Sequence, residues 1–98
     1  MVPSVSVAVL TLQLFLHGSN SLKEKRSRLK PLIFRLQREF NISVAEVGFQ
    51  DSWQNSLVAC VIVSNEADHN MRSLQAVVAW VENSWPDVEV VSEQIELL

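Results

Sequence analysis

Seven of the eight lysine and arginine residues of this chain lie between positions 23 and 38, although the net charge of the whole chain is −3. They are Lys23, Lys25, Arg26, Arg28, Lys30, Arg35 and Arg38. Only one acid, Glu24, lies in the same stretch, so the rest of the chain is acidic. Such a separation of charge steers an anionic partner to one side of a molecule. The chemistry that these residues favour is the binding of phosphate or carboxylate groups.

The start of this basic stretch has the features of an anion site. Ser21 followed by Glu24 has the spacing of a capping box, which predicts a helix that begins at this point. Unpaired N–H groups at a helix start attract anions, and the hydroxyls of Ser19 and Ser21 lie beside them. The candidate anion- or RNA-binding residues are Ser21, Lys23, Lys25, Arg26, Lys30, Arg35 and Arg38. No second glycine lies between Gly18 and Lys23, so this is not a Walker A loop.

Two aromatic residues are candidates for contact with a partner. Phe34 lies among the cations, on the predicted outer side of the helix between Lys30 and Arg38. An aromatic side chain among cations is typical of surfaces where bases stack or proteins dock. Trp80 lies outside the apolar arc of the second predicted helix. Its alternative role is to pack against the rim of the sheet.

The chain offers no recognisable catalytic or metal-binding constellation. Cys60 lies in the middle of an apolar run, where we expect a buried and inert thiol. His17 and His69 belong to no recognisable motif that would pair them with a catalytic base or nucleophile. One cysteine and two histidines supply a metal site poorly and form no intramolecular disulfide. We therefore expect no catalysis, no metal and no cofactor.

Six predicted elements must position these residues. Apolar and β-branched runs predict strands over 4–16, 41–50, 56–63 and 88–97. One helix is expected from Ser21 to about Phe40, and a second, capped by Asn65 or Asp68, ends near Ser84. The order β-α-β-β-α-β predicts a single α+β domain over 1–98 with a ferredoxin-like fold. In that fold a four-stranded antiparallel sheet carries both helices on one face.

The first helix is predicted to be apolar on the face toward the sheet and cationic on the face toward solvent. Its apolar residues fall within about a 100° arc that would face the sheet; they are Leu22, Leu29, Leu32, Ile33, Leu36 and Phe40. Lys25 lies at the border of that arc, so we expect it to pair with Glu46 or Asp51. Pro31 removes a backbone hydrogen bond and should kink or split the helix near residue 30.

Three segments should converge at one end of the predicted sheet. They are the loop before the first helix, the hairpin "DSWQN" and the turn "NSWPD". The candidate pocket residues at this end are Asp51, Trp53, Gln54 and Trp85. The alternative is that the tryptophans only seal the end of the core.

The sheet face that the helices leave open is expected to be apolar or to be disrupted by bulges. In the first strand Val5, Val7 and Val9 have one parity, and the leucines at 10, 12, 14 and 16 have the other. The last strand changes parity in the same way. Either a bulge reverses the facing of each strand, or the open face itself is apolar. Large bare apolar faces are rare on monomers, so we expect a homodimer or higher oligomer through this face.

The apolar N-terminal run is too short to span a membrane, and no lysine or arginine precedes it. We interpret it as a strand and expect a cytoplasmic protein without membrane contact.

The motifs "SLKEKR", "FNISVAEV" and "DSWQ", at their spacings here, resemble those of the DUF503 or YlxP-like family of small bacterial proteins. The resemblance covers nearly the whole chain and implies a ferredoxin-like α+β fold. It implies no established activity; the family's frequent gene neighbourhood with translation and ribosome-maturation genes suggests a role linked to RNA. Family members tend to have an arginine where this chain has Asn55, and a proline where it has His17 and Gly18.

Two functions remain open from the sequence. One is an accessory protein that binds structured RNA or a ribosomal particle through the basic helix. Because "SLVACVIV" has no aromatic residue, RNA contact would not follow the base-stacking mode of RRM sheets. The other is an oligomeric interaction or regulatory module whose basic helix faces an acidic protein surface.

Overall fold

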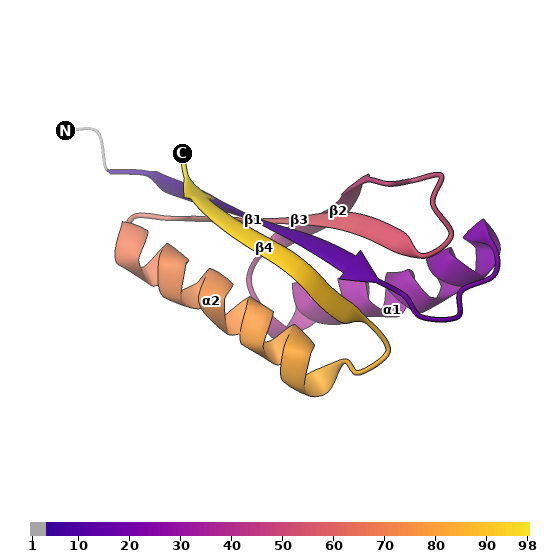
Figure 1. The fold of residues 1–98 in the computed structure, drawn as a ribbon. Coiled ribbons are helices and arrows are strands. Elements are labelled where there is room, and N and C mark those ends of the chain that lie inside the picture. The colour runs from indigo at the N-terminus through magenta and orange to yellow at the C-terminus, as the bar shows by residue number, and fades with distance from the viewer. Residues whose placement is uncertain (1–3) are drawn as a thin grey trace.

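The computed structural model describes residues 4–98, and its elements follow the predicted order. The elements are β1 (Ser6–Phe15), α1 (Leu22–Glu39), β2 (Ser43–Gly48), β3 (Asn55–Ser64), α2 (Ala67–Ser84) and β4 (Glu89–Leu97). The strands form one antiparallel sheet in the order β2-β3-β1-β4. Both helices lie on the same face of this sheet, and the opposite face is open (Figure 1). The predicted ferredoxin-like α+β fold is therefore confirmed.

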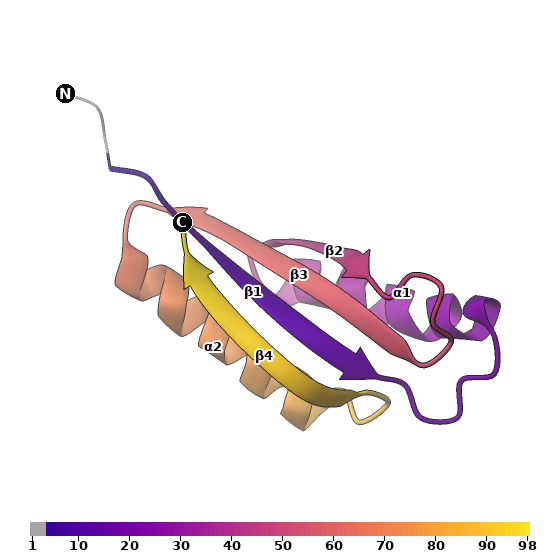
Figure 2. The ribbon, with the colours of Figure 1, turned by 45° about the horizontal axis from the view of Figure 1, so that its top comes forward.

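The core lies between the sheet and the two helices. β1 and β3, the central strands, bury every second side chain, as alternation in a half-covered antiparallel sheet requires. Against them the helices bury Leu29, Leu32, Leu36, Leu74, Val77 and Val81. Figure 2 shows that α1 runs under the β2 side of the sheet and α2 under the β4 side. The sheet is thus divided between the helices, and each helix keeps its other side exposed.

Helix α1 begins and ends where the sequence predicts. The Ser21 hydroxyl accepts a hydrogen bond from the Glu24 backbone N–H at 3.0 Å, and Phe40 is the C-terminal cap. The helix continues through Pro31 as one element of 18 residues, so the predicted split does not occur. Three buried leucines, one before Pro31 and two after it, hold both halves on the same sheet. Packing therefore offsets the backbone hydrogen bond that proline removes.

The predicted cap of α2 is wrong. Neither Asn65 nor Asp68 caps this helix; its N-cap is Glu66, whose side chain makes no capping bond. The Ser64 hydroxyl instead accepts from the Glu66 N–H at 3.1 Å and bonds to Asn70 at 2.7 Å. Asn70, fully buried, donates to the Ser6 carbonyl at 3.1 Å. A polar residue inside the first turn thus ties the helix start to β1.

The two parity changes in the sequence have different structural causes. In β4 the register against β1 shifts between Gln13 and Leu14, so a bulge changes its facing there. In β1 the pairing with β3 runs without a shift from Ser6 to Phe15. Its odd-numbered valines therefore lie on the open face, and that face is apolar. Within residues 4–98, no helix is both long and apolar enough to cross a membrane.

The continuous helix at Pro31 gives a stability prediction. Proline in a helix interior costs about 3 kcal/mol relative to alanine, and Pro31 is exposed, so alanine would meet no packing constraint there. We expect Pro31→Ala to raise the free energy of unfolding by about 1–3 kcal/mol, as measured by urea denaturation. An unchanged or lower value would show that the proline ring makes a stabilising contact.

Candidate anion-binding surface

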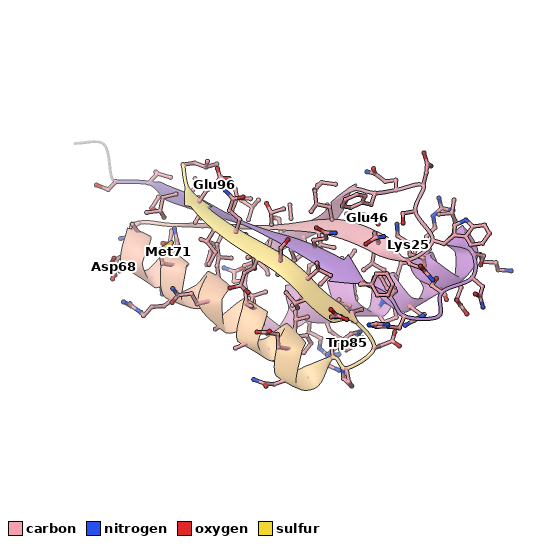
Figure 3. The ribbon with its side chains drawn as sticks, in the orientation of Figure 1. Lys25, Glu46, Asp68, Met71, Trp85 and Glu96 are labelled. Atoms are coloured by element: carbon pink, nitrogen blue, oxygen red, sulfur yellow. The ribbon has the colours of Figure 1, made fainter. Side chains whose placement is uncertain are left out.

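Lys25 does not belong to the anion-binding surface, because its side chain is buried. It is 1% exposed, and its Nζ donates to the carbonyl oxygens of Phe49 at 2.6 Å and Ser52 at 2.8 Å. The same ammonium lies 3.0 Å from the Glu46 carboxylate. Of the two predicted partners, Glu46 is confirmed, whereas Asp51 is exposed. In Figure 3 the Lys25 and Glu46 side chains meet beside the β2–β3 hairpin. The prediction of Lys25 as an anion ligand is therefore wrong.

The Lys25 ammonium organises the hairpin between β2 and β3. Phe49 has φ 58°, a left-handed conformation that is uncommon for a residue with a side chain. Its carbonyl accepts from both Lys25 Nζ and the Ser52 N–H. The Ser52 hydroxyl in turn accepts from the Asn55 N–H at 3.0 Å. The ammonium of Lys25 thus supplies a hydrogen bond to the Ser52 carbonyl and a second one to the Phe49 carbonyl, and so stabilises the tight turn.

Arg28 links the other two loops at this end of the sheet. Its guanidinium donates to the Asp87 carboxylate and backbone carbonyl, each at 3.0 Å, and to the His17 carbonyl at 2.8 Å. The Leu16 N–H donates to the Gln54 carbonyl at 2.7 Å. The three loops therefore converge as the topology predicts. The predicted topology brings the turn "NSWPD" and the loop before α1 to the same end of the sheet, but the connecting role of Arg28 was missed, because the sequence does not show which cation links the two.

Arg35 and Trp80 take part in a packed cluster between the helices. The Arg35 guanidinium lies 5.7 Å from the Trp80 ring centroid and 3.2 Å from the Glu39 carboxylate. Trp80 also stacks on Trp85 and contacts Phe40 edge to face. Trp80 is partly buried against the core. It is therefore a packing residue, but its aromatic partners are Phe40 and Trp85 rather than the sheet rim of the alternative prediction. Arg35 is only partly free.

The helix start is already occupied by the chain's own groups. The Ser21 hydroxyl is engaged by the Glu24 N–H, and the Glu24 carboxylate accepts from the Asn20 N–H at 2.6 Å. Ser19 is buried and bonds to the Ser21 carbonyl. An external anion would have to displace a carboxylate that lies beside the same N–H groups. The predicted anion site at the helix start is thus closed by its own cap.

Four cations remain exposed and form one line on α1. Within the described chain, Lys23, Arg26, Lys30 and Arg38 are exposed and pair with no carboxylate. With Phe34, which is 61% exposed, they recur every three or four residues and fall within about a 120° arc. From Lys23 to Arg38 the line is roughly 22 Å long at the rise of an α-helix. We call these five residues the basic stripe.

The loop-end candidates do not all converge on one site. Asp51, Trp53 and Gln54 are exposed on the hairpin, with Trp53 at 56%. Trp85 instead stacks on Trp80 of α2. The indole N–H of Trp85 is buried and has no hydrogen-bond acceptor among the described residues. A hollow of about 210 Å³ lies elsewhere, where β2 begins and β3 ends; it is lined by Asn41, Ile42, Ser43, Val61 and Val63.

Comparisons with known proteins agree on the fold and the family motifs. A family model described as "Protein of unknown function (DUF503)" matches residues 7–95. An uncharacterised protein of Bacillus subtilis strain 168, YlxP, is 38% identical over 74 residues, which cover 76% of this chain and 79% of that protein. The de novo designed protein Foldit4 has a similar structure, with a TM-score of 0.54 at 11% identity over 95% of this chain and 96% of its own. This last likeness concerns the fold alone.

The buried ammonium of Lys25 gives a second stability prediction. Lys25→Met keeps the length of the side chain but removes the ammonium's hydrogen bonds to the Phe49 and Ser52 carbonyls and leaves the Glu46 carboxylate without its countercharge. Breaking a buried charge pair costs about 3–5 kcal/mol, so we expect a loss of that size in the urea-derived free energy of unfolding. Lys23→Met, on the exposed stripe, is the matched control and should change it by less than about 0.5 kcal/mol. Equal effects of the two substitutions would contradict a structural role for Lys25.

The Cys60 thiol should be unreactive in the folded chain. Burial in β3 raises the pKa of Cys60 to about 12 from 9.0. Because only the thiolate is nucleophilic, the thiol of the folded chain should react slowly. We expect no reaction with Ellman's reagent at pH 8 in native buffer, and one thiol per chain in guanidinium. Between pH 9 and 12 the unfolded chain releases this proton first, so the contribution of Cys60 to stability falls as pH rises. Rapid native labelling would contradict this prediction.

Proposed function

The chain belongs to the DUF503 family, and from that premise we propose that it is a cytoplasmic accessory protein that binds structured RNA or a ribosomal particle through α1. It acts by binding rather than by catalysis. The observation that carries this proposal is the basic stripe: four cations without acidic partners in one line on an exposed helix face. Cations that serve only the fold are paired, as Lys25 and Arg28 are here.

The division of the cations supports an external anion. Viewed down α1, the paired residues Lys25, Arg28 and Arg35 fall between about 120° and 200° from Lys23, outside the arc of the stripe. The stripe itself faces away from the sheet, so its charges are not neutralised by the acidic remainder of the chain. A rigid line of cations about 22 Å long matches a phosphate backbone better than a single small anion.

Phe34 favours RNA over a plain polyanion. Its ring is 61% exposed and lies between Lys30 and Arg38 on the stripe. A base stacked on an exposed aromatic ring contributes about 1–3 kcal/mol. RNA offers such bases in loops and bulges, where they are unstacked and flanked by phosphates. We therefore propose that the stripe binds RNA at a loop or bulge within a folded structure.

The four cations set the expected dependence on salt. Each phosphate contact releases counterions, so log K should fall with log salt at a slope near −2.8 for four contacts to an unpaired strand. The combined charge reversal of Lys23, Arg26 and Arg38 to glutamate removes three of these contacts. From counterion release alone, we expect roughly 100-fold weaker binding at 0.1 M salt. Fluorescence anisotropy with a labelled RNA hairpin carrying an unpaired loop measures both quantities.

Arg72→Glu is the matched control for this experiment. Arg72 is an exposed cation on α2, outside the stripe, so its reversal should leave the affinity and salt slope unchanged. Circular dichroism shows whether each variant keeps the fold. Equal affinity of the triple variant and the wild type would remove the proposal. Retention of an acidic protein from an extract in an RNase-resistant manner, with no RNA binding, would favour the interaction module instead.

A further inference from the structure

The open face of the sheet is apolar at one end and mixed at the other, where each strand pair joins one polar and one apolar residue. The register places Val7 opposite Val63 and Val9 opposite Val61, so these four side chains form one patch across the central strands. Val63 is 61% exposed. Further along the same face the pairs are Thr11 with Ala59, Gln13 with Leu57, and Phe15 with Asn55. An antiparallel sheet that faces water normally shows polar residues there, so this valine patch requires an occupant.

The chemistry of the face excludes an anionic partner. None of the four strands contains a lysine or an arginine, and the basic stripe lies on the helical side of the molecule. β1 and β3 also contain no acidic residue. The centre of the open face is thus uncharged, while β4 at one edge presents Glu89 and Glu96 on this face. Neither RNA nor an anionic membrane surface suits such a face.

An uncharged centre is the property that a self-associating face needs. In a twofold interface the same surface of both copies meets, so any charge near the axis would oppose an identical charge. From strand spacing and length, the face measures roughly 33 by 19 Å, or about 600 Å². Two such faces bury about 1,200 Å², the lower bound for a stable specific interface. We infer that the open face is the interface between two copies of this chain.

The distribution of residues also selects the direction of the twofold axis. An axis parallel to the strands, between β1 and β3, stacks β1 of each copy over β3 of the other and keeps both valine patches at the same end. It also places the acidic edge strand β4 over β2, whose open-face residues Ser43 and Ala45 are neutral. An axis across the strands would set Val9 over Gln13 and Val63 over Asn55, and would set the two β4 strands over each other. We therefore place the axis along the strands.

The consequence is that Val7 of one copy lies over Val63 of its partner. The hollow lined by Val61 and Val63 borders this contact and offers space for an aliphatic side chain. Helix α1 lies on the far face of each sheet (Figure 1). The dimer thus leaves both basic stripes free on its outer sides. Dimerisation and RNA binding are therefore separate properties, and each can fail without the other.

Sedimentation velocity without RNA, over 1–100 µM, tests the interface. We expect the wild-type chain to form a dimer. Val63→Lys should raise its dissociation constant at least tenfold, because an ammonium in an apolar interface is desolvated without a partner. Val63 is exposed, so the substitution should not impair folding, which circular dichroism can verify. Phe34→Lys, which changes an equally exposed apolar residue on the helical side, should leave the dimer unchanged. A monomer at all concentrations, or a dimer that Val63→Lys does not weaken, would overturn the inference.

Disulfide trapping tests the axis. When Val7→Cys and Val63→Cys chains are mixed and oxidised, we expect mainly the mixed disulfide between the two variants. The buried native Cys60 should not interfere. For an axis across the strands, Val63→Cys would cross-link instead with Asn55→Cys, at the opposite end of β3. A disulfide between Val63→Cys and Asn55→Cys chains, without one between Val7→Cys and Val63→Cys chains, would overturn the proposed axis.

Discussion

The arrangement of this protein depends on the buried ammonium of Lys25. It is held by the carbonyls of Phe49 and Ser52 and by the Glu46 carboxylate. Lys25, Ser52 and Glu46 come from "SLKEKR", "DSWQ" and "FNISVAEV", and Phe49 lies between the last two motifs. The three motifs that carry the family resemblance thus meet around one charge. A buried lysine is costly unless every donor finds an acceptor. Here that requirement fixes the start of α1 against the β2–β3 hairpin and so sets the orientation of the whole helix.

The orientation of α1 separates two classes of cation. Lys25 and Arg28 point toward the loops at the end of the sheet and hold them together through carbonyl and carboxylate partners. The four cations of the basic stripe lie on the opposite side of the helix, where none of them forms an ion pair with a carboxylate of residues 4–98. One helix therefore serves both the fold and an outer charged surface. The open sheet face, which is uncharged at its centre, lies on the other side of the molecule. We infer that this face serves self-association rather than anion binding.

The sequence predicts the elements better than the contacts between them. Alternating apolar residues and the Ser21 cap follow from local patterns, and helical phase gives Lys25 an acidic partner, either Glu46 or Asp51, of which the structure selects Glu46. The pairing of Arg35 with Glu39 has an i, i+4 signal that could have been used. Arg28 could not be assigned, because the topology brings the turn that contains Asp87 to this end of the sheet without showing which cation of α1 reaches it. The facing of β1 likewise depended on whether a bulge was present, which its composition does not reveal.

The central claim is that α1 uses one side for structure and the other for an external anion. Amide chemical-shift mapping tests it most directly: ¹⁵N-labelled protein is titrated with the RNA hairpin, and the perturbed residues are located. We predict that the largest shifts lie on the helix face formed by Lys23, Arg26, Lys30, Phe34 and Arg38, with the Phe49–Ser52 turn unchanged. Shifts centred on the hairpin or on the open sheet face, with the stripe unaffected, would contradict this account.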